Sequence, residues 1–168
     1  MDNPFTPPTV GGPLAAQAGE YLTLRLGDEE YAMDILQVQE LRSYEQPIRM
    51  VNSPPFIKGV IDLRGVIVPI VDLRLKFNLA VADYSEATVV VILCIHGSVI
   101  GVVVDAVSDV VAFDAGAIRP APQFESAIDA RFIVGLVHAG ERMLIVLDMD
   151  TLLSGPEVGL TARVASKV

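Results

Sequence analysis

Short apolar runs separated by turn residues dominate the chain, a pattern typical of β-strands rather than of amphipathic helices. Five such runs are expected to form strands in the first half of the chain: 21–26, 31–34, 38–44, 56–63 and 66–71. Arg64-Gly65 supplies a tight turn between the last two. Pro69 cannot donate to a strand ladder, so we expect it at an edge or a bulge.

The segment 87–104 has eighteen residues without a formal charge, which is the length at which a membrane-spanning helix must be considered. Val and Ile dominate it, however, and the turn residues His96, Gly97 and Ser98 divide it into two halves of strand length. The pattern therefore favours a buried β-hairpin.

The chain also repeats itself. Residues 57–72 align without a gap on residues 133–148, and a weaker match places 32–41 on 101–110. The two offsets differ by seven residues, which indicates an insertion between Val110 and Ile133. Such a repeat predicts two five-stranded sets of strands.

Short helical segments complete each copy. One helical turn is expected near Ile35, and longer segments are expected over 72–77 and 149–153. Asp72 begins the first of these as an N-cap, and Asp148 or Asp150 does the same for the second. Because Asp72 and Asp148 are equivalent in the repeat, capping explains both.

Composition and charge limit the classes of partner that the protein is expected to bind. The chain is 52% hydrophobic with a formal charge of −9, so nucleic acid or an acidic membrane surface would be repelled and proteins are the expected partners. Cys94 is alone, which excludes an internal disulfide and favours a reducing compartment. We interpret residues 1–18 as a flexible tail without a secretory signal, and 156–168 as a C-terminal tail with some helix-forming potential.

No catalytic pattern emerges. An aspartic protease would need Thr or Ser and then Gly after Asp72 and Asp148, and neither has them. The two histidines, His96 and His138, are expected in hairpin turns and are too few for a metal site. No phosphate-binding loop or nucleophile elbow occurs, so neither an enzyme nor a cofactor is expected.

Some residues are not required by folding alone. Arg64 lies at a hairpin tip, where a solvated turn residue is equally good an explanation, and Glu40 lies on a strand where simple exposure would also explain it. The proline-stiffened stretch 118–124 presents Arg119 and Phe124, residue types that are enriched at interfaces, although it could also be only a connector.

These patterns resemble the CheW family of chemotaxis coupling proteins. The resemblance runs through about residues 18–155, including the stretches 26–31, 35–40, 56–60, 63–74, 104–110 and 118–122. It implies an all-β fold of two intertwined SH3-like five-stranded β-barrels with short helical segments. The expected CheW-like domain is 19–155, with lobe 1 at about 19–80 plus the C-terminal helical segment and lobe 2 at about 84–148.

The resemblance also implies a function: a cytoplasmic, non-enzymatic adaptor that is recruited to receptor arrays and couples methyl-accepting chemoreceptors to the regulatory domain of the histidine kinase CheA. It places six residues in a receptor-binding groove: Ile35, Val38, Glu40, Arg64, Val107 and Val110. It places Arg119 and Phe124 at the contact with the kinase. Three alternatives stay open: a paralogue serving another array such as one for surface motility, a small hydrolase with an unrecognised site, and the regulatory domain of a kinase.

Overall fold

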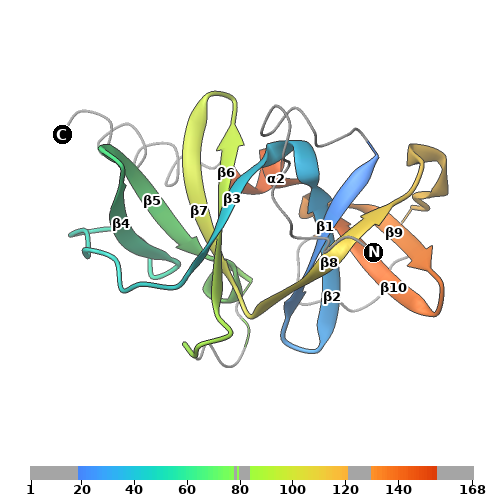
Figure 1. Cartoon of the computed structure of the whole chain (residues 1–168), viewed down its shortest axis with the longest axis horizontal. Coiled ribbons are helices and arrows are strands. Elements are labelled where there is room, and N and C mark those ends of the chain that lie inside the picture. Colours follow the sequence, from blue (N-terminus) through green and yellow to red (C-terminus); the bar gives the residue numbers. More distant parts are fainter. Residues whose placement is uncertain (1–18, 78, 80–83, 121–129, 155–168) are drawn as a thin grey trace.

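The computed structural model describes residues 19–77, 79, 84–120 and 130–154, and in them two five-stranded sheets lie side by side (Figure 1). Sheet A runs in the order β8 (Ala106–Ala112), β1 (Glu20–Leu26), β2 (Glu29–Asp34), β10 (Arg142–Leu147) and β9 (Ile133–Ala139). Sheet B runs in the order β3 (Val38–Ser43), β6 (Val89–Ile95), β7 (Ser98–Val104), β5 (Val66–Asp72) and β4 (Ile57–Leu63). The all-β class is confirmed.

Helical segments are short. In the described residues they are α1 (Leu73–Lys76), α2 (Met149–Leu153) and three 3₁₀ turns at Ile35–Gln37, Ala115–Ala117 and Ala130–Phe132. Within the described part of the chain, none of the helices combines the length and the apolar character that crossing a bilayer requires.

The two sheets do not divide the described chain into two successive halves. Sheet B is built from one continuous stretch, 38–104, whereas sheet A combines strands from both ends of the described chain. Local patterns predict where strands lie but not which strands pair. Sheet A joins strands from both ends of the described chain because β2 pairs in parallel with β10, and β5 pairs in parallel with β7 in sheet B. In the strand pairing both sheets have free edges, so neither is a closed barrel.

The internal repeat is visible in the strand register. Opposite Ile70 and Val71, strand β4 has a bulge between Ile57 and Gly59, and β9 has the same bulge between Ile133 and Gly135. At both glycines a neighbouring backbone comes so close that an added Cβ would lie 2.0 Å from the Ile48 carbonyl oxygen or 2.4 Å from that of Arg119. Glycine is required at both positions because a side chain would collide with main-chain atoms.

The capping prediction is also confirmed. Asp72 accepts a hydrogen bond from the Arg74 amide at the start of α1, and Asp148 accepts one from the Thr151 amide at the start of α2. Each aspartate amide in turn donates to an equivalent carbonyl of the repeat, that of Phe56 or of Phe132.

Three apolar clusters hold the fold together. The largest lies between the sheets and takes residues from both, including Leu24, Val91 and Val102. A smaller one contains Leu63 and Ile92 of sheet B, and another belongs to sheet A. Since the cluster between the sheets draws on both, neither sheet covers its inner face without the other.

One buried charge network joins the sheets. The Arg74 side chain is fully buried and donates to Asp72, which is also fully buried, and at 2.7 Å to Asp105. Asp105 lies between β7 and β8, where the chain passes from sheet B to sheet A, and its other oxygen accepts from the Gly27 amide in the β1–β2 turn. The network therefore ties α1 to the tip of a hairpin in the other sheet.

Two local expectations were wrong. Pro69 is buried on β5, an interior strand of sheet B, and not at an edge or a bulge. The position is tolerated because pairing of β5 with β7 begins only at Ile70, so no ladder bond is needed there on that side. His138 lies within β9 opposite Met143 rather than in a turn, whereas His96 does occupy the β6–β7 turn.

Candidate protein-binding surfaces

A bulge in the edge strand β3 separates two of the candidate receptor residues. Val38 pairs with Leu93 and Glu40 with the adjacent Ile92, so Gln39 is the extra residue. Cross-strand partners point to the same face of a sheet. Val38 therefore shares the face of Leu93, which belongs to the cluster between the sheets, while Glu40 shares the opposite face with Ile92.

The four apolar candidates contact the same core cluster. All are half-buried and pack against the cluster between the sheets, and we call them the apolar strip: Ile35, Val38, Val107 and Val110. Strand β8 carries a bulge like that of β3, which brings Val107 opposite Leu24 and Val110 opposite Leu22. Val38 and Val107 are equivalent in the repeat, so the strip draws on both copies.

The two charged candidates form an ion pair. The Arg64 guanidinium donates to Glu40 at 2.6 Å, and Arg42 lies 3.4 Å from the other oxygen of the same carboxylate. Hydrogen bonding from Arg64 lowers the pKa of the Glu40 carboxyl below its usual range. Sequence reasoning missed Arg42, although its position two residues after Glu40 on one strand was a usable signal.

Arg64 has an unusual backbone. Its φ is 52°, in the left-handed region, and the repeat has Gly140 with a φ of 66° at the same position. A non-glycine residue is uncommon there, and the left-handed conformation costs it about 1–2 kcal/mol. A glycine would suit the turn better, so the turn alone does not explain the arginine.

Sheet A has a counterpart that sequence reasoning missed. Arg142 donates at 2.9 Å to Asp109, the repeat equivalent of Glu40, and at 2.7 Å to Glu30. The buried Thr23 hydroxyl also bonds the Asp109 carboxylate. Arg142 lowers the pKa of the Asp109 carboxyl. Searching the second repeat for a cation near its turn, two positions past Gly140, would have found it.

The kinase candidates lie elsewhere. Arg119 is exposed and forms an isolated bridge with Leu136 through two 2.8 Å backbone hydrogen bonds, so it extends sheet A beyond its edge strand β9. In strand order this is the edge opposite β8, which carries Val107 and Val110. Phe124 lies outside the described residues.

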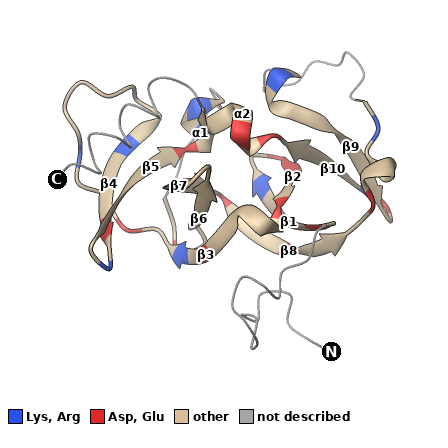
Figure 2. Ribbon diagram, turned by 90° about the horizontal axis from the view of Figure 1, so that it is seen from above, with Lys and Arg blue, Asp and Glu red and all other residues tan. Residues whose placement is uncertain are grey.

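Basic residues are few and scattered over the ribbon in Figure 2. Among the described residues no three His, Cys, Asp or Glu side chains gather closely enough to hold a metal ion. His96 lies 3.7 Å from Asp150, but their side chains are 76% and 48% exposed. Water screens such a pair, so it lacks the enclosed setting that acid–base catalysis requires.

Comparisons with known proteins agree with this geometry. The family model described as CheW-like domain matches residues 20–157. The chemotaxis protein CheW of Klebsiella aerogenes is 51% identical over 146 residues, covering 87% of this chain and 88% of the relative. A probable chemotaxis protein CheW of Rhizobium etli is 32% identical, covering 82% and 89%.

A solved structure has the same fold. The crystal structure of the scaffolding protein TtCheW from Thermoanaerobacter tengcongensis superposes with a TM-score of 0.75 at 29% identity, covering 84% of this chain and 91% of that one. The chain therefore belongs to the CheW family of chemotaxis scaffold proteins.

Proposed function

We propose that this chain is a non-enzymatic adaptor that couples the cytoplasmic tips of methyl-accepting chemoreceptors to the regulatory domain of the histidine kinase CheA. It works in the cytoplasm and reaches membrane receptor arrays through protein contacts alone. The finer SH3-like character of each lobe is part of the same proposal. Membership of a scaffold family supports it, together with two candidate surfaces on separate edges.

The apolar strip is the proposed floor of the receptor site. Its four residues are half-buried, so each keeps apolar surface that a partner can cover. A helical receptor tip presents apolar side chains at helical spacing, and helices of this kind dock into apolar grooves. Because the strip borders the edge strand β3, such a helix can reach the edge of that strand as well.

The Arg64–Glu40 pair is the proposed polar rim, and the backbone of Arg64 is the observation that carries this assignment. An exposed ion pair is worth about 0–1 kcal/mol to folding, less than or similar to the cost of holding Arg64 at positive φ. The pair therefore gives the fold little or nothing. A binding role explains why an arginine stands where the repeat has Gly140.

Arg119 and Phe124 are the proposed kinase contact. Arg119 is exposed at the β9 edge, in strand order across sheet A from the β8 part of the apolar strip. Since the two surfaces use different edges, one chain can hold a receptor and a kinase at once.

Two variants test the proposal by calorimetry with a receptor signalling fragment and with the CheA regulatory domain. Arg64→Gly relieves the left-handed strain while removing the guanidinium, so it should weaken receptor binding roughly tenfold or more, without loss of stability. Kinase affinity should be unchanged. Arg119→Asp should weaken kinase binding and leave receptor affinity unchanged.

If either variant lost binding to both the receptor fragment and the kinase domain, the assignment of separate surfaces would be contradicted. The same holds if either variant bound both partners normally. A paralogue serving a surface-motility array would show the same separation with a different receptor fragment, so a panel of receptor fragments identifies the array. Turnover of an ester or peptide substrate would instead favour the hydrolase alternative.

A further inference from the structure

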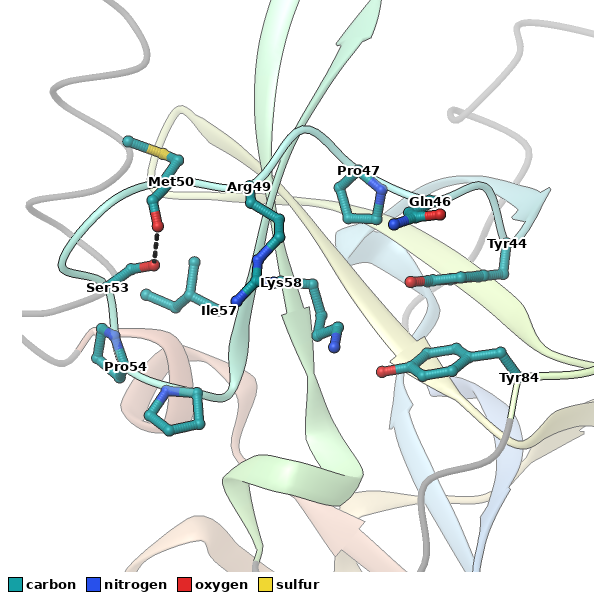
Figure 3. A pocket seen from close by; sticks show the side chains of 11 residues that line it. Tyr44, Gln46, Pro47, Arg49, Met50, Ser53, Pro54, Ile57, Lys58 and Tyr84 are labelled. Atoms are coloured by element: carbon teal, nitrogen blue, oxygen red, sulfur yellow. Dashed lines mark hydrogen bonds between the residues drawn. The ribbon is translucent and has the colours of Figure 1, made fainter.

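A pocket of about 430 Å³ opens beside the β3–β4 connection, in sheet B (Figure 3). Its described lining residues come from 44–58, with Tyr84 closing one side. This volume falls within the range of small-molecule sites, about 300–1,000 Å³. The pocket is separate from the apolar strip, from the Arg64–Glu40 pair and from Arg119, none of which lines it.

Two cations face the pocket. The side chains of Arg49 and Lys58 both extend into the space between the loop and Tyr84 in Figure 3. The lining in the described part of the chain contains no acidic residue, and no described carboxylate forms a salt bridge with Arg49 or Lys58. In a protein with a formal charge of −9, two cations that line one pocket and have no acidic partner among the described residues create a local preference for anions.

Flat, rigid groups form the walls. Tyr44 and Tyr84 stack with ring centroids 4.4 Å apart and an angle of 26° between planes, and Pro47 and Pro54 line the loop side. The Tyr84 hydroxyl donates at 2.6 Å to the buried Asp72 carboxylate. This bond anchors the aromatic wall to the network that joins the sheets, so the wall is formed before any ligand arrives.

We propose that this pocket binds a small aromatic anion. Arg49 and Lys58 hold its carboxylate or phosphate group, because guanidinium and ammonium groups are the usual partners of both. The ring lies against the tyrosine and proline carbons that line the pocket. Tyr44 stacks on Tyr84, and Lys58 and Arg74 already lie over the Tyr84 ring, at 5.2 and 4.8 Å from its centroid. Tight binding needs both parts of the site. The cations favour a ligand with a negative charge, and the walls favour a ligand with an aromatic ring.

Four probes test both halves: benzoate, phenyl phosphate, neutral phenol and inorganic phosphate, each titrated into the full chain and followed by two-dimensional amide NMR. Benzoate or phenyl phosphate should give saturable shifts at amides of the pocket, and whichever binds more tightly identifies the preferred acidic group. Phenol and inorganic phosphate should bind at least tenfold more weakly than that probe.

Arg49→Gln and Lys58→Gln should each weaken the preferred aromatic anion roughly tenfold, as expected for the loss of a charged hydrogen-bond donor. Arg25→Gln is the matched control, since it removes the same charge from an exposed position on β1 of sheet A; its affinity should equal that of the parent. Surface substitutions of this kind leave stability nearly unchanged.

Equal binding of phenol would show that charge is not used, and equal binding of inorganic phosphate would show that the ring is not used. If Arg25→Gln weakened anion binding as much as the pocket variants do, the loss of affinity would come from the change in net charge and not from the pocket. An acidic peptide is titrated in parallel as a fifth probe, and a response to it with none to the small anions would make the pocket a protein-docking site. Each of these results overturns the proposal.

Discussion

Replacing Arg74 by Met should strongly destabilise the fold. The Arg74 and Asp72 side chains are both fully buried, and the guanidinium donates to both oxygens of Asp72 at 3.0 Å. Methionine leaves the Asp72 carboxylate buried, and among the described residues only the Tyr84 hydroxyl and the amide of residue 74 remain as its donors. Removing one partner of a buried pair typically costs about 3–5 kcal/mol.

The matched control is Asp148→Ala. Asp148 is the repeat equivalent of Asp72 and caps α2, but no arginine of the described residues binds it, and Asp150 stands at the position equivalent to Arg74. Loss of an N-cap costs about 1 kcal/mol. At about 2–4 °C per kcal/mol for a domain of 150–250 residues, Arg74→Met should lower the thermal midpoint by about 6–20 °C, against about 2–4 °C for the control.

Urea denaturation and calorimetry on both variants measure these costs. Binding to receptor and kinase should follow the folded fraction, because neither Arg74 nor Asp72 belongs to a candidate surface. If Arg74→Met cost no more than Asp148→Ala, the charge network would contribute only a cap, and the sheets would be held together by apolar contact alone. The reasoning from burial would then be refuted.

Three further outcomes are expected. Arg64→Gly should raise the pKa of the Glu40 carboxyl, as followed by its side-chain NMR titration, because the main cause of its lowering is gone. Arg142→Met should be most destabilising near neutral pH. Its deficit in urea unfolding should shrink below about pH 4, since a carboxyl with lowered pKa, here Asp109, loses its stabilising contribution as it protonates. Gly135→Ala should lower the thermal midpoint through a collision with backbone, at a cost of about 1–3 kcal/mol.

Much of the fold could be predicted from the sequence because the signals are local. Both repeat-equivalent caps, the β6–β7 hairpin and the helical turn at Ile35 follow from residue type and spacing within a few positions. The alignment of 57–72 on 133–148 likewise predicted equivalent hairpins, down to the shared glycines.

The parts that failed depend on pairing between distant segments. Pro69 lies on an interior strand because β5 pairs in parallel with β7, more than twenty-five residues away in the sequence. The bulge that puts Glu40 and Val38 on opposite faces of β3 is equally invisible in the alternation of residue types, which predicts residues two apart on one face. A single extra residue reverses which face a side chain occupies.

The two crossings between the sheets explain why the apolar strip lies where it does. The described chain passes from sheet A to sheet B after β2 and returns after β7, and the strip follows both crossings, with Ile35 and Val38 after the first and Val107 and Val110 after the second. At each crossing the chain leaves one sheet and enters the other. Its side chains there pack against the cluster between the sheets but remain only partly buried. A partner that covers the strip therefore contacts both sheets at the positions where they are connected, and substitutions in the strip will change stability together with binding. Arg64, at a hairpin tip outside the crossings, is the position where the two effects separate.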